Sequence, residues 1–288
     1  MEQLVAPASP RYWFELSPNG EKLTYTQDDG EPCLTLPYVS NLDGSEAVRF
    51  GWGPTWAECE IRANARSPRW SPDGRTVITV GAWEPLGPTG PIKYTIFSLD
   101  VATGKVSHIN VRDCGTKSVP CIDQVSLEVV WAPDGRSIYT TLWEKLENYE
   151  GRIHVVRIDL PSLAVTRLYT DATNNSPDFL GPSVYDVSKD GATLSLRIHY
   201  SVHSGRSPRL ALLKTDGSGE LRFITPPETG NPAWPTFCPV GGEERIFYVD
   251  KKRPSELRWV RTNATDDGIF YTVGHGIEVP RCQRPPSK

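Results

Sequence analysis

The sequence predicts an all-β fold, a single β-propeller of five four-stranded blades. One short phrase recurs five times along the 288 residues: a hydrophobic pair, a small residue, Pro or Lys, then Asn/Asp-Gly or a variant, and an alternating strand. The small residue falls at positions 17, 71, 132, 188 and 238, which gives steps of 54, 61, 56 and 50 residues. The chain also holds 24 Gly and 26 Pro, a composition that suits short strands joined by many turns. A repeat of this period, built from strands and tight turns, is typical of a radial β-array.

The second copy shows how one phrase extends into a four-stranded blade. Residues 67–71 form a short strand, Pro72-Asp73-Gly74 turns the chain, and residues 75–80 return with β-branched side chains in alternation. After a loop rich in Gly and Pro, residues 93–99 and 105–109 form an outer hairpin. Four antiparallel strands in succession make one propeller blade.

The other copies divide the rest of the chain in the same way. The predicted blades are residues 11–50, 67–110, 127–170, 183–225 and 234–274, followed by a tail over residues 275–288. The turns of the outer hairpins carry Asp43-Gly44, Thr103-Gly104, Pro161-Ser162, Asp216-Gly217 and Asp267-Gly268. Because the repeats run from end to end, we expect one domain over residues 1–288. A six-bladed ring, with one blade split between the termini, is the alternative, and the two tails are short for it.

The phrase Ser-Pro-Asp-Gly followed by an alternating strand resembles the TolB-type, WD40-like repeat called PD40. Residues 71–80 and 132–141 match this repeat well, the copies at positions 17 and 188 match in part, and the copy at position 238 is degenerate. The resemblance covers nearly the whole chain and implies the propeller fold. It implies no single activity, because the family includes binding modules and the propeller domains of peptidases.

Charge and motif content argue against several classes of partner and cofactor. The formal net charge is −4 without any run of Lys or Arg, so we expect neither nucleic acid nor an anionic membrane as a partner. No apolar stretch reaches the roughly 18–20 residues of a membrane span. The sequence lacks a Gly-x-Ser-x-Gly elbow, a His-Glu-x-x-His motif, a phosphate loop and a dinucleotide fingerprint. We therefore expect no metal and no cofactor.

Cysteine use favours a secretory chain. Six cysteines exceed what a cytosolic enzyme of this size needs. Cys114 and Cys121 flank a loop short enough for a disulfide, and Cys282 is expected to tie the tail to the first blade through Cys33 or Cys59.

Two N-glycosylation sequons, beginning at Asn174 and Asn263, agree with that setting. Together these features predict a secreted or secretory-lumen protein whose signal peptide has been replaced by Met1. The alternative is a cytosolic protein with reduced, mostly buried thiols.

Long connections gather on one face of the predicted propeller. The turns between strands one and two, and three and four, are uniformly tight, whereas the other loops are long. Strand two of each blade ends at the face with the long loops, where Trp83, Trp143 and His199 occupy equivalent places. Aromatic residues around a few polar groups are the usual lining of a site for a small, largely apolar ligand.

A structural role competes with function at these positions. Trp83 and Trp143 could anchor loops against the neighbouring blade, and a histidine at a strand edge is often satisfied by its neighbours. Trp70 and Trp131, which precede the Pro-Asp-Gly turns, are expected to pack between blades.

The chain is similar to stand-alone propellers of fungal secondary metabolism, among them hetero-Diels–Alderases that join a tropolone-derived quinone methide to a sesquiterpene. This similarity rests on size, repeat type, cysteine use and the absence of cofactor motifs. It implies a cofactor-free enzyme that holds small apolar substrates in an aromatic pocket. The pocket would be lined by Trp83, Trp143, Tyr149, Tyr200 and Trp234, with Trp56 from an inter-blade loop. The candidate donors to a substrate carbonyl are His199, Arg62 and Arg66, and Glu84 and Glu144 are candidates for dehydration of an alcohol precursor.

Two other functions fit the same sequence. A propeller without cofactors can serve as a protein-interaction or ligand-binding scaffold. Five-bladed propellers also house glycosidases, which need carboxylates that project into the channel, and Glu15, Glu128 and Asp186 are the candidates for that role.

Overall fold

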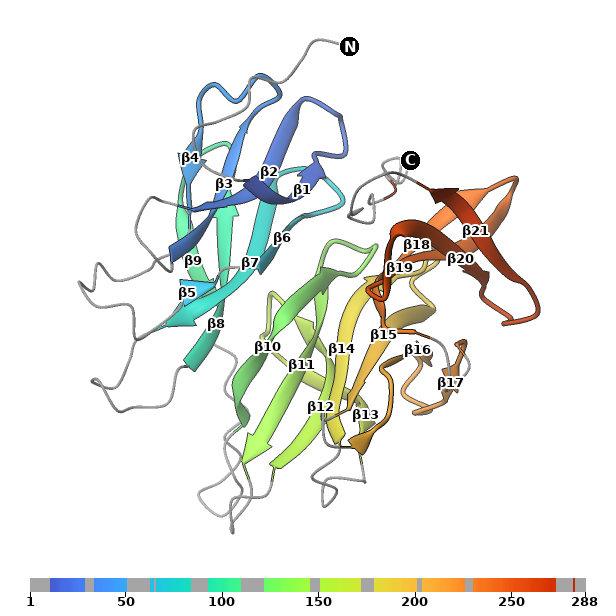
Figure 1. Cartoon of the computed structure of the whole chain (residues 1–288). Helices are drawn as coiled ribbons and strands as arrows, with labels where there is room; N and C mark the ends of the chain where they lie inside the picture. The colour runs from blue at the N-terminus through green and yellow to red at the C-terminus, as the bar shows by residue number, and fades with distance from the viewer. Residues whose placement is uncertain are drawn as a thin grey trace. The chain divides into compact units, whose positions relative to one another are not determined.

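Antiparallel strands make up nearly all of the described structure (Figure 1). The computed structural model describes residues 11–28, 34–50, 63–64, 66–83, 93–109, 122–145, 151–171, 179–200, 204–225, 230–272 and 282. Within these ranges, the side chains of residues 11–13, 28, 34–35, 63–64, 66–67, 82–83, 93–95, 122–127, 143–145, 151 and 179–180 are not described. The described ranges contain no helix with the length and hydropathy that a membrane crossing requires.

Five sheets follow one another along the chain, each with its strands in sequence order. The first contains β1 (Arg11–Leu16), β2 (Lys22–Asp28), β3 (Leu34–Asn41) and β4 (Val48–Arg49), with β5 (Ala63–Asn64) parallel to β3. The second contains β6 (Arg66–Trp70), β7 (Thr76–Trp83), β8 (Lys93–Asp100) and β9 (Val106–Ile109). The third contains β10 (Ile122–Trp131), β11 (Ser137–Lys145), β12 (Gly151–Asp159) and β13 (Val165–Thr170). The fourth contains β14 (Phe179–Val187), β15 (Thr193–Tyr200), β16 (Arg209–Lys214) and β17 (Leu221–Phe223). The fifth contains β18 (Pro232–Val240), β19 (Glu243–Asp250), β20 (Arg253–Arg261) and β21 (Asp267–Thr272).

These sheets are the blades of a five-bladed β-propeller, so the predicted fold class is confirmed. The first strands of the third and fourth blades begin earlier than predicted, at Ile122 and Phe179. Contacts within the chain cluster into two compact units, residues 1–131 with 283–288 and residues 132–282. The single domain over residues 1–288 stays a prediction.

A repeated turn explains why each phrase carries a small residue. In the second blade, the Ser71 hydroxyl accepts the Thr76 N–H at 2.9 Å and donates to the Asp73 carboxylate at 2.6 Å. Ser17 and Ser188 accept the N–H five residues later in the same way, at 2.8 and 2.9 Å. The glycine that closes the second turn, Gly74, lies at φ +70°, where any side chain would be strained. The turn is therefore fixed by local hydrogen bonds, which is why it could be predicted from the sequence.

The third blade forms the same turn with a serine at a different position. Ala132 replaces the small serine, and Ser137 supplies the hydroxyl instead, 3.3 Å from Asp134. Asp134 also accepts the Arg136 and Ser137 N–H groups, at 2.8 and 3.1 Å. The aspartate therefore keeps its role in this turn, although alanine occupies the position that serine has in the first, second and fourth blades.

The tryptophans before the turns pack between blades, as predicted. The Trp70 indole N–H donates to the Glu15 carbonyl in the blade before it, at 3.2 Å. The Trp131 indole N–H donates to the Arg69 carbonyl at 3.2 Å in the same manner. Both indoles are buried, at 6% and 8% exposure, and each has its one polar group satisfied.

Apolar packing joins the fourth and fifth blades through β16 on one side and β18 and β19 on the other. Leu210 and Leu212 of β16 pack in one cluster with Phe237 of β18 and with Ile246 and Tyr248 of β19. Since neighbouring residues of a strand face opposite sides, this seam uses only every second residue of each strand. The alternate positions of β15 that share this face are polar, and they form the candidate site described below.

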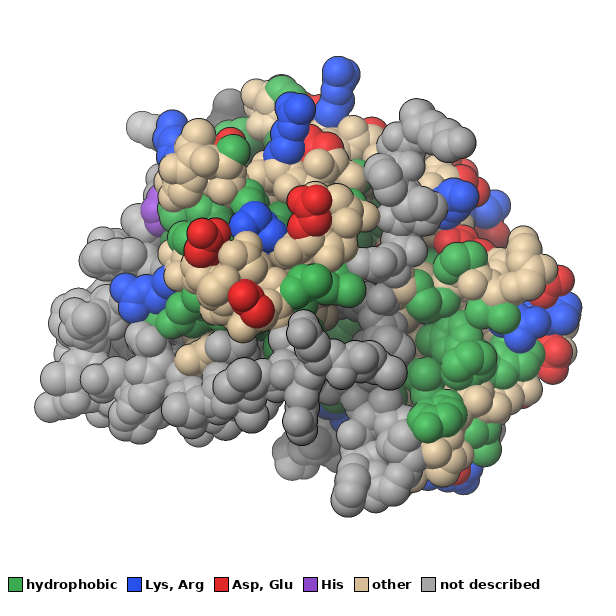
Figure 2. All heavy atoms as spheres, turned by 90° about the horizontal axis from the view of Figure 1, so that it is seen from above, with side chains coloured by type: hydrophobic (Ala, Val, Ile, Leu, Met, Phe, Trp, Pro, Cys, Tyr) green, Lys and Arg blue, Asp and Glu red, His purple; other side chains and the backbone are tan. Residues whose placement is uncertain are grey.

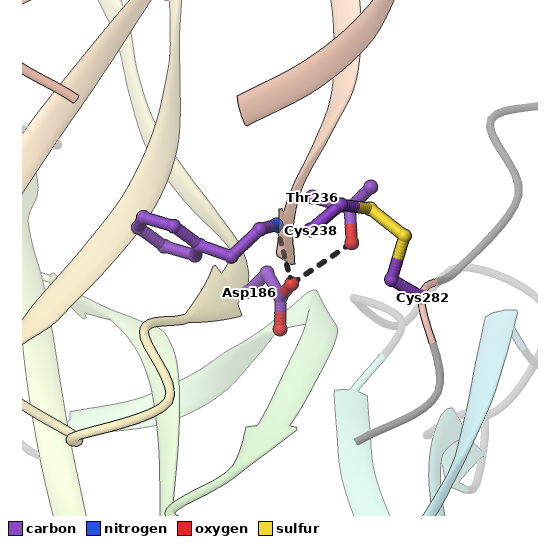
Figure 3. The surroundings of a disulfide bond; sticks show 5 residues. Asp186, Thr236, Cys238 and Cys282 are labelled. Carbon is purple, nitrogen blue, oxygen red and sulfur yellow. Dashed lines mark hydrogen bonds between the residues drawn. A yellow bond between two sulfur atoms is a disulfide. The ribbon is translucent and has the colours of Figure 1, made fainter. Parts of the chain in front are cut away.

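An aspartate on the fourth blade binds the first strand of the fifth (Figure 3). One Asp186 carboxylate oxygen accepts the Thr236 hydroxyl and the Phe237 N–H, each at 2.8 Å. The other carboxylate oxygen accepts the Val187 N–H at 2.9 Å. The two donors from β18 hold that strand against the fourth blade, and the Val187 N–H of β14 orients the carboxylate.

Next to Asp186, a disulfide joins Cys238 to Cys282, with their Cα atoms 5.3 Å apart (Figure 3). The prediction that Cys282 would pair with Cys33 or Cys59 is therefore wrong. Cys238 is the small residue of the fifth phrase, and the cysteine that follows the last strand returns to the blade it has just left. Cys33, Cys59, Cys114 and Cys121 lie outside the described residues. Disulfides persist in oxidising compartments, and this bond is compatible with such a setting.

The edge strand of the fifth blade exposes hydrophobic side chains. Ile269, Phe270 and Tyr271 of β21 are 51%, 57% and 59% exposed. Figure 2 shows hydrophobic side chains gathered on the right-hand side of that view. The Phe270 ring also makes an edge contact with Phe247 at 5.0 Å between centroids, so its inner side belongs to the blade.

We expect the disulfide to stabilise the fifth blade by restricting the unfolded chain. Its cysteines are 44 residues apart, and a loop of that length corresponds to about 2–4 kcal/mol in the free energy of unfolding. Cys282→Ser should lower that free energy by this amount in urea denaturation, and the double variant with Cys238→Ser should lose little more. A midpoint unchanged in both variants, or unchanged by reduction of the wild-type protein, would contradict the role given to this bond.

Candidate functional site

The structure tests only some of the predicted site residues. Trp56, Arg62, Glu84, Tyr149 and Asn174 lie outside the described residues. Arg66, Trp83, Trp143 and Glu144 lie on β6, β7 and β11, but their side chains are not described. His199, Tyr200 and Trp234 are described in full, and Asn263 lies in an exposed turn. The roles assigned to all of these residues stay predictions.

The described candidates lie at the end of β15 and the start of β18, within residues 132–282. Ser195, Arg197 and His199 alternate along β15 and share the face that meets the fifth blade. The Ser195 hydroxyl donates to the Pro235 carbonyl at 3.1 Å, which places this face against β18. His199 pairs with Gly181 of β14, where a side chain would meet Ile153 at 2.2 Å. Only glycine fits opposite this histidine.

Arg197 is the centre of the cluster. Its side chain is only 9% exposed, and its Nε donates to the Pro232 carbonyl at 2.8 Å. One terminal nitrogen donates to Asn231 Oδ1 at 2.6 Å, and the other lies 3.3 Å from His199 Nδ1. The guanidinium thus links three groups and holds β15 against the start of β18.

Asp250 holds Asn231 in place from the end of β19. Its Oδ1 accepts the Asn231 N–H at 2.8 Å and the Lys252 N–H at 3.0 Å. Asp250 is only 8% exposed. Gly230 allows this approach, because a Cβ there would lie 2.1 Å from the Asp250 carboxylate. A chain of hydrogen-bonded groups therefore runs from Asp250 through Asn231 and Arg197 to His199.

Arg197 determines which nitrogen of His199 carries the proton. A guanidinium can only donate, so His199 Nδ1 accepts and the neutral ring carries its hydrogen on Nε2. Nε2 is buried and has no hydrogen-bond partner among the described residues. Burial, followed by the nearby positive charges of Arg197 and Lys251, lowers the pKa of His199 to about 3. His199 is therefore a neutral imidazole with a buried, unused N–H donor.

Trp234 lies beside this cluster in a strained part of β18. The register of β18 shifts between Ala233 and Thr236, and Trp234 adopts φ +54° within that bulge. Its indole packs against the apolar cluster of the fifth blade, and the Lys251 ammonium lies 4.8 Å from its ring centroid. A bulge that turns a large aromatic out of the regular alternation is a feature often found next to binding sites.

Tyr200 ends β15 on the other side of His199. Its ring lies 5.8 Å from the Arg206 guanidinium carbon. Tyr169 at the end of β13 is close enough that Tyr200 contributes to its raised pKa, which burial raises most. The predicted aromatic residues at this end of the blades are thus accompanied by a third aromatic that the sequence reasoning did not single out.

Arg197 and Asn231, which hold the site together, were not among the predicted functional residues. The signal for Arg197 was present, because it lies two residues before His199 on an alternating strand and shares its face. No comparable signal existed for Asn231, which meets Arg197 across 34 residues of sequence. The structure thus adds a buried cation to a site predicted as mainly aromatic.

Two of the three carboxylates considered for glycoside hydrolysis, Glu15 and Asp186, have structural roles. Glu15 accepts the Trp70 N–H at 3.2 Å, and Asp186 accepts the Phe237 N–H at 2.8 Å. Both lie two residues before the small residue of their phrase, and both bind the backbone of the next blade. Glu128 is buried on β10. Among the described residues, no group of three or more His, Cys, Asp and Glu could hold a metal ion.

Three solved structures illustrate what this chain is similar to. It resembles a prolyl endopeptidase with a TM-score of 0.56 and 12% identity, over 91% of this chain and 36% of that one. It resembles an oligogalacturonate lyase in complex with manganese with a TM-score of 0.58 and 15% identity, over 92% of this chain and 66% of that one. It resembles the hydrazine synthase of Kuenenia stuttgartiensis with a TM-score of 0.61 and 12% identity, over 92% of this chain and 39% of that one.

At these identities the likeness shows the β-propeller fold alone, and the chain spans between about one third and two thirds of these proteins. Because all three are enzymes, an enzymatic role is compatible with the fold. No family model matches the sequence, and no curated protein matches it.

We expect His199 to make the protein sensitive to acid. Its pKa is about 3 in the folded chain and near the ordinary 6.5 in the unfolded chain, so the unfolded chain binds more protons between these values. The free energy of unfolding should therefore fall as the pH drops from 6.5 towards 3, by about 2–3 kcal/mol at pH 4 from this residue. His199→Gln keeps an acceptor for Arg197 but does not titrate, and it should remove this part of the loss.

Urea denaturation at pH 7 and pH 4 compares the wild type with the variant. The nitrogen chemical shifts of His199 should show a neutral ring with hydrogen on Nε2 down to about pH 4. Equal acid losses in both proteins, or an imidazolium at pH 6, would contradict the assignment.

Proposed function

We propose that this chain binds a small, largely apolar organic molecule through a carbonyl oxygen at His199, and that it acts on that molecule without a cofactor. One observation carries the proposal: the buried Nε2–H of His199 has no acceptor among the described residues. A buried donor without a partner costs about 1–3 kcal/mol. A ligand oxygen at hydrogen-bond distance from Nε2 would recover that free energy.

The surroundings of His199 suit such a ligand. Arg197 fixes the tautomer, so the donor needs no rearrangement when a ligand arrives. The depressed pKa keeps the ring neutral, which makes Nε2–H a hydrogen-bond donor and not an acid that gives up its proton.

A hydrogen bond from His199 would stabilise negative charge that develops on the carbonyl oxygen in the transition state. Holding two reactive partners in one orientation would add rate without any covalent step by the protein. A hetero-Diels–Alder cycloaddition in a secretory, secondary-metabolite setting is the reaction that combines these features. In that reaction Glu84 or Glu144 would serve the dehydration that precedes it.

The proposal is tested with acetophenone, which has a carbonyl group, and ethylbenzene, which has the same size without one. Acetophenone should bind the wild type and shift the His199 Nε2 resonance. His199→Phe should weaken acetophenone binding by roughly two- to tenfold, the value of one neutral hydrogen bond, and leave ethylbenzene unaffected.

Nuclear magnetic resonance titration measures both affinities on the same samples. No perturbation of His199 by acetophenone would overturn the proposal and favour a protein-interaction scaffold. Cleavage of an aryl glycoside that depends on Glu15 or Asp186 would favour the glycosidase.

A further inference from the structure

We propose that the ligand of this site carries a negative charge, a carboxylate or an enolate-type oxygen, which binds at Arg197 beside His199. This inference rests on the proposed function and specifies its substrate class. The charge of Arg197, its burial and its N–H groups that take part in no bond among the described residues carry the inference.

Arg197 is a buried cation whose hydrogen-bond partners are all neutral. Its three nitrogen atoms bond to a backbone carbonyl, a side-chain amide and an imidazole. No carboxylate is hydrogen-bonded to it among the described residues, although it is only 9% exposed. Two of its five N–H groups take part in none of these bonds.

Asp250 is the carboxylate associated with this cluster, and it reaches Arg197 only through Asn231. Its Oδ1 is occupied by the Asn231 and Lys252 N–H groups. The Asp250 charge therefore orients Asn231 and does not form an ion pair with the guanidinium. Burying a cation without a direct ionic partner costs on the order of several kcal/mol.

A second cation lies close by. Lys251 is exposed, and its ammonium lies 4.8 Å from the centroid of the Trp234 ring. Arg197 and Lys251 both act on His199 with the same sign. Arg197 therefore brings a buried positive charge next to the His199 N–H donor, Lys251 adds positive charge at longer range, and this combination matches an anion.

Arg197 also has a structural role, because it joins β15 to β18. That role alone would need only the Pro232 and Asn231 bonds, which a neutral donor such as glutamine could make in part. The inference differs from it in one measurable respect, because only the charge of Arg197 would favour an anion over a neutral molecule of the same shape.

The experiment compares benzoate with acetophenone, which has nearly the same shape and no charge. In 20 mM salt at pH 7, benzoate should bind the wild type at least tenfold more tightly than acetophenone and should shift the His199 resonances. Arg197→Gln should weaken benzoate binding by roughly ten- to a hundredfold, the value of hydrogen bonds to a charged group, and should change acetophenone binding little.

Lys251→Gln removes a positive charge without changing a residue that packs between the fourth and fifth blades. Because Lys251 is exposed, the protein should keep its stability, and benzoate binding should fall by roughly two- to fivefold. Lys189→Gln is the matched control, since Lys189 is also exposed but lies in the turn at the opposite end of β15. This control should leave the affinity for benzoate unchanged.

The outcomes separate the two proposals. If acetophenone perturbs His199 and benzoate binds no more tightly, the charge inference fails and the proposed function stands. If neither probe perturbs His199, both fail. If the benzoate preference survives both Arg197→Gln and Lys251→Gln, the anion site lies elsewhere and the inference is overturned.

Discussion

The turn that begins each blade is the constraint on which the rest of the structure depends. In the fourth blade, the Ser188 hydroxyl accepts the Thr193 N–H at 2.9 Å and donates to Asp190 at 2.6 Å. These bonds set the register in which β15 begins its return along β14. A bulge between Val184 and Asp186 then shifts the pairing, and in the new register His199 lies opposite Gly181 near the far end of the strand. A further one-residue slip would turn the polar face of β15 away from the fifth blade. The position of the candidate site thus depends on both the turn and the bulge of this strand pair.

The seam between the fourth and fifth blades combines two kinds of interaction with different consequences. Leucine and aromatic side chains pack against one another in this seam and contribute hydrophobic burial, which does not depend on a precise orientation. Asp186 and Arg197 contribute directional hydrogen bonds. Asp186 binds the Thr236 hydroxyl and the Phe237 N–H. Arg197 binds the Pro232 carbonyl and Asn231. The carboxylate accepts from three donors, whereas two of the five guanidinium N–H groups take part in no bond among the described residues. That asymmetry separates a structural group from one that is suited to a ligand.

Position within the repeat shows why equivalent residues have different roles. The residue two before the small residue is Glu15 in the first blade and Asp186 in the fourth, and both bind the backbone of the next blade. In the second blade the same place is Arg69, whose side chain is not a carboxylate, although its carbonyl accepts the Trp131 indole N–H just as the Glu15 carbonyl accepts that of Trp70. The contact with the next blade thus recurs at the same position of the repeat, whereas the side chain at that position differs between blades. Carboxylates that a sequence pattern could assign to a catalytic channel are therefore used here for assembly.

The sequence by itself determined the fold class, the number of blades, the turns and the burial of Trp70 and Trp131. These features follow from interactions between residues near in sequence and from a two-residue alternation, and both are visible in a linear pattern. It also brought out His199, Tyr200 and Trp234 as residues at the ends of strands. Only the tertiary structure decided that Cys282 pairs with Cys238 and that Arg197 sets the tautomer of His199. Both depend on contacts between separate strands, whose partners are chosen by how blades and tail pack and not by any local spacing.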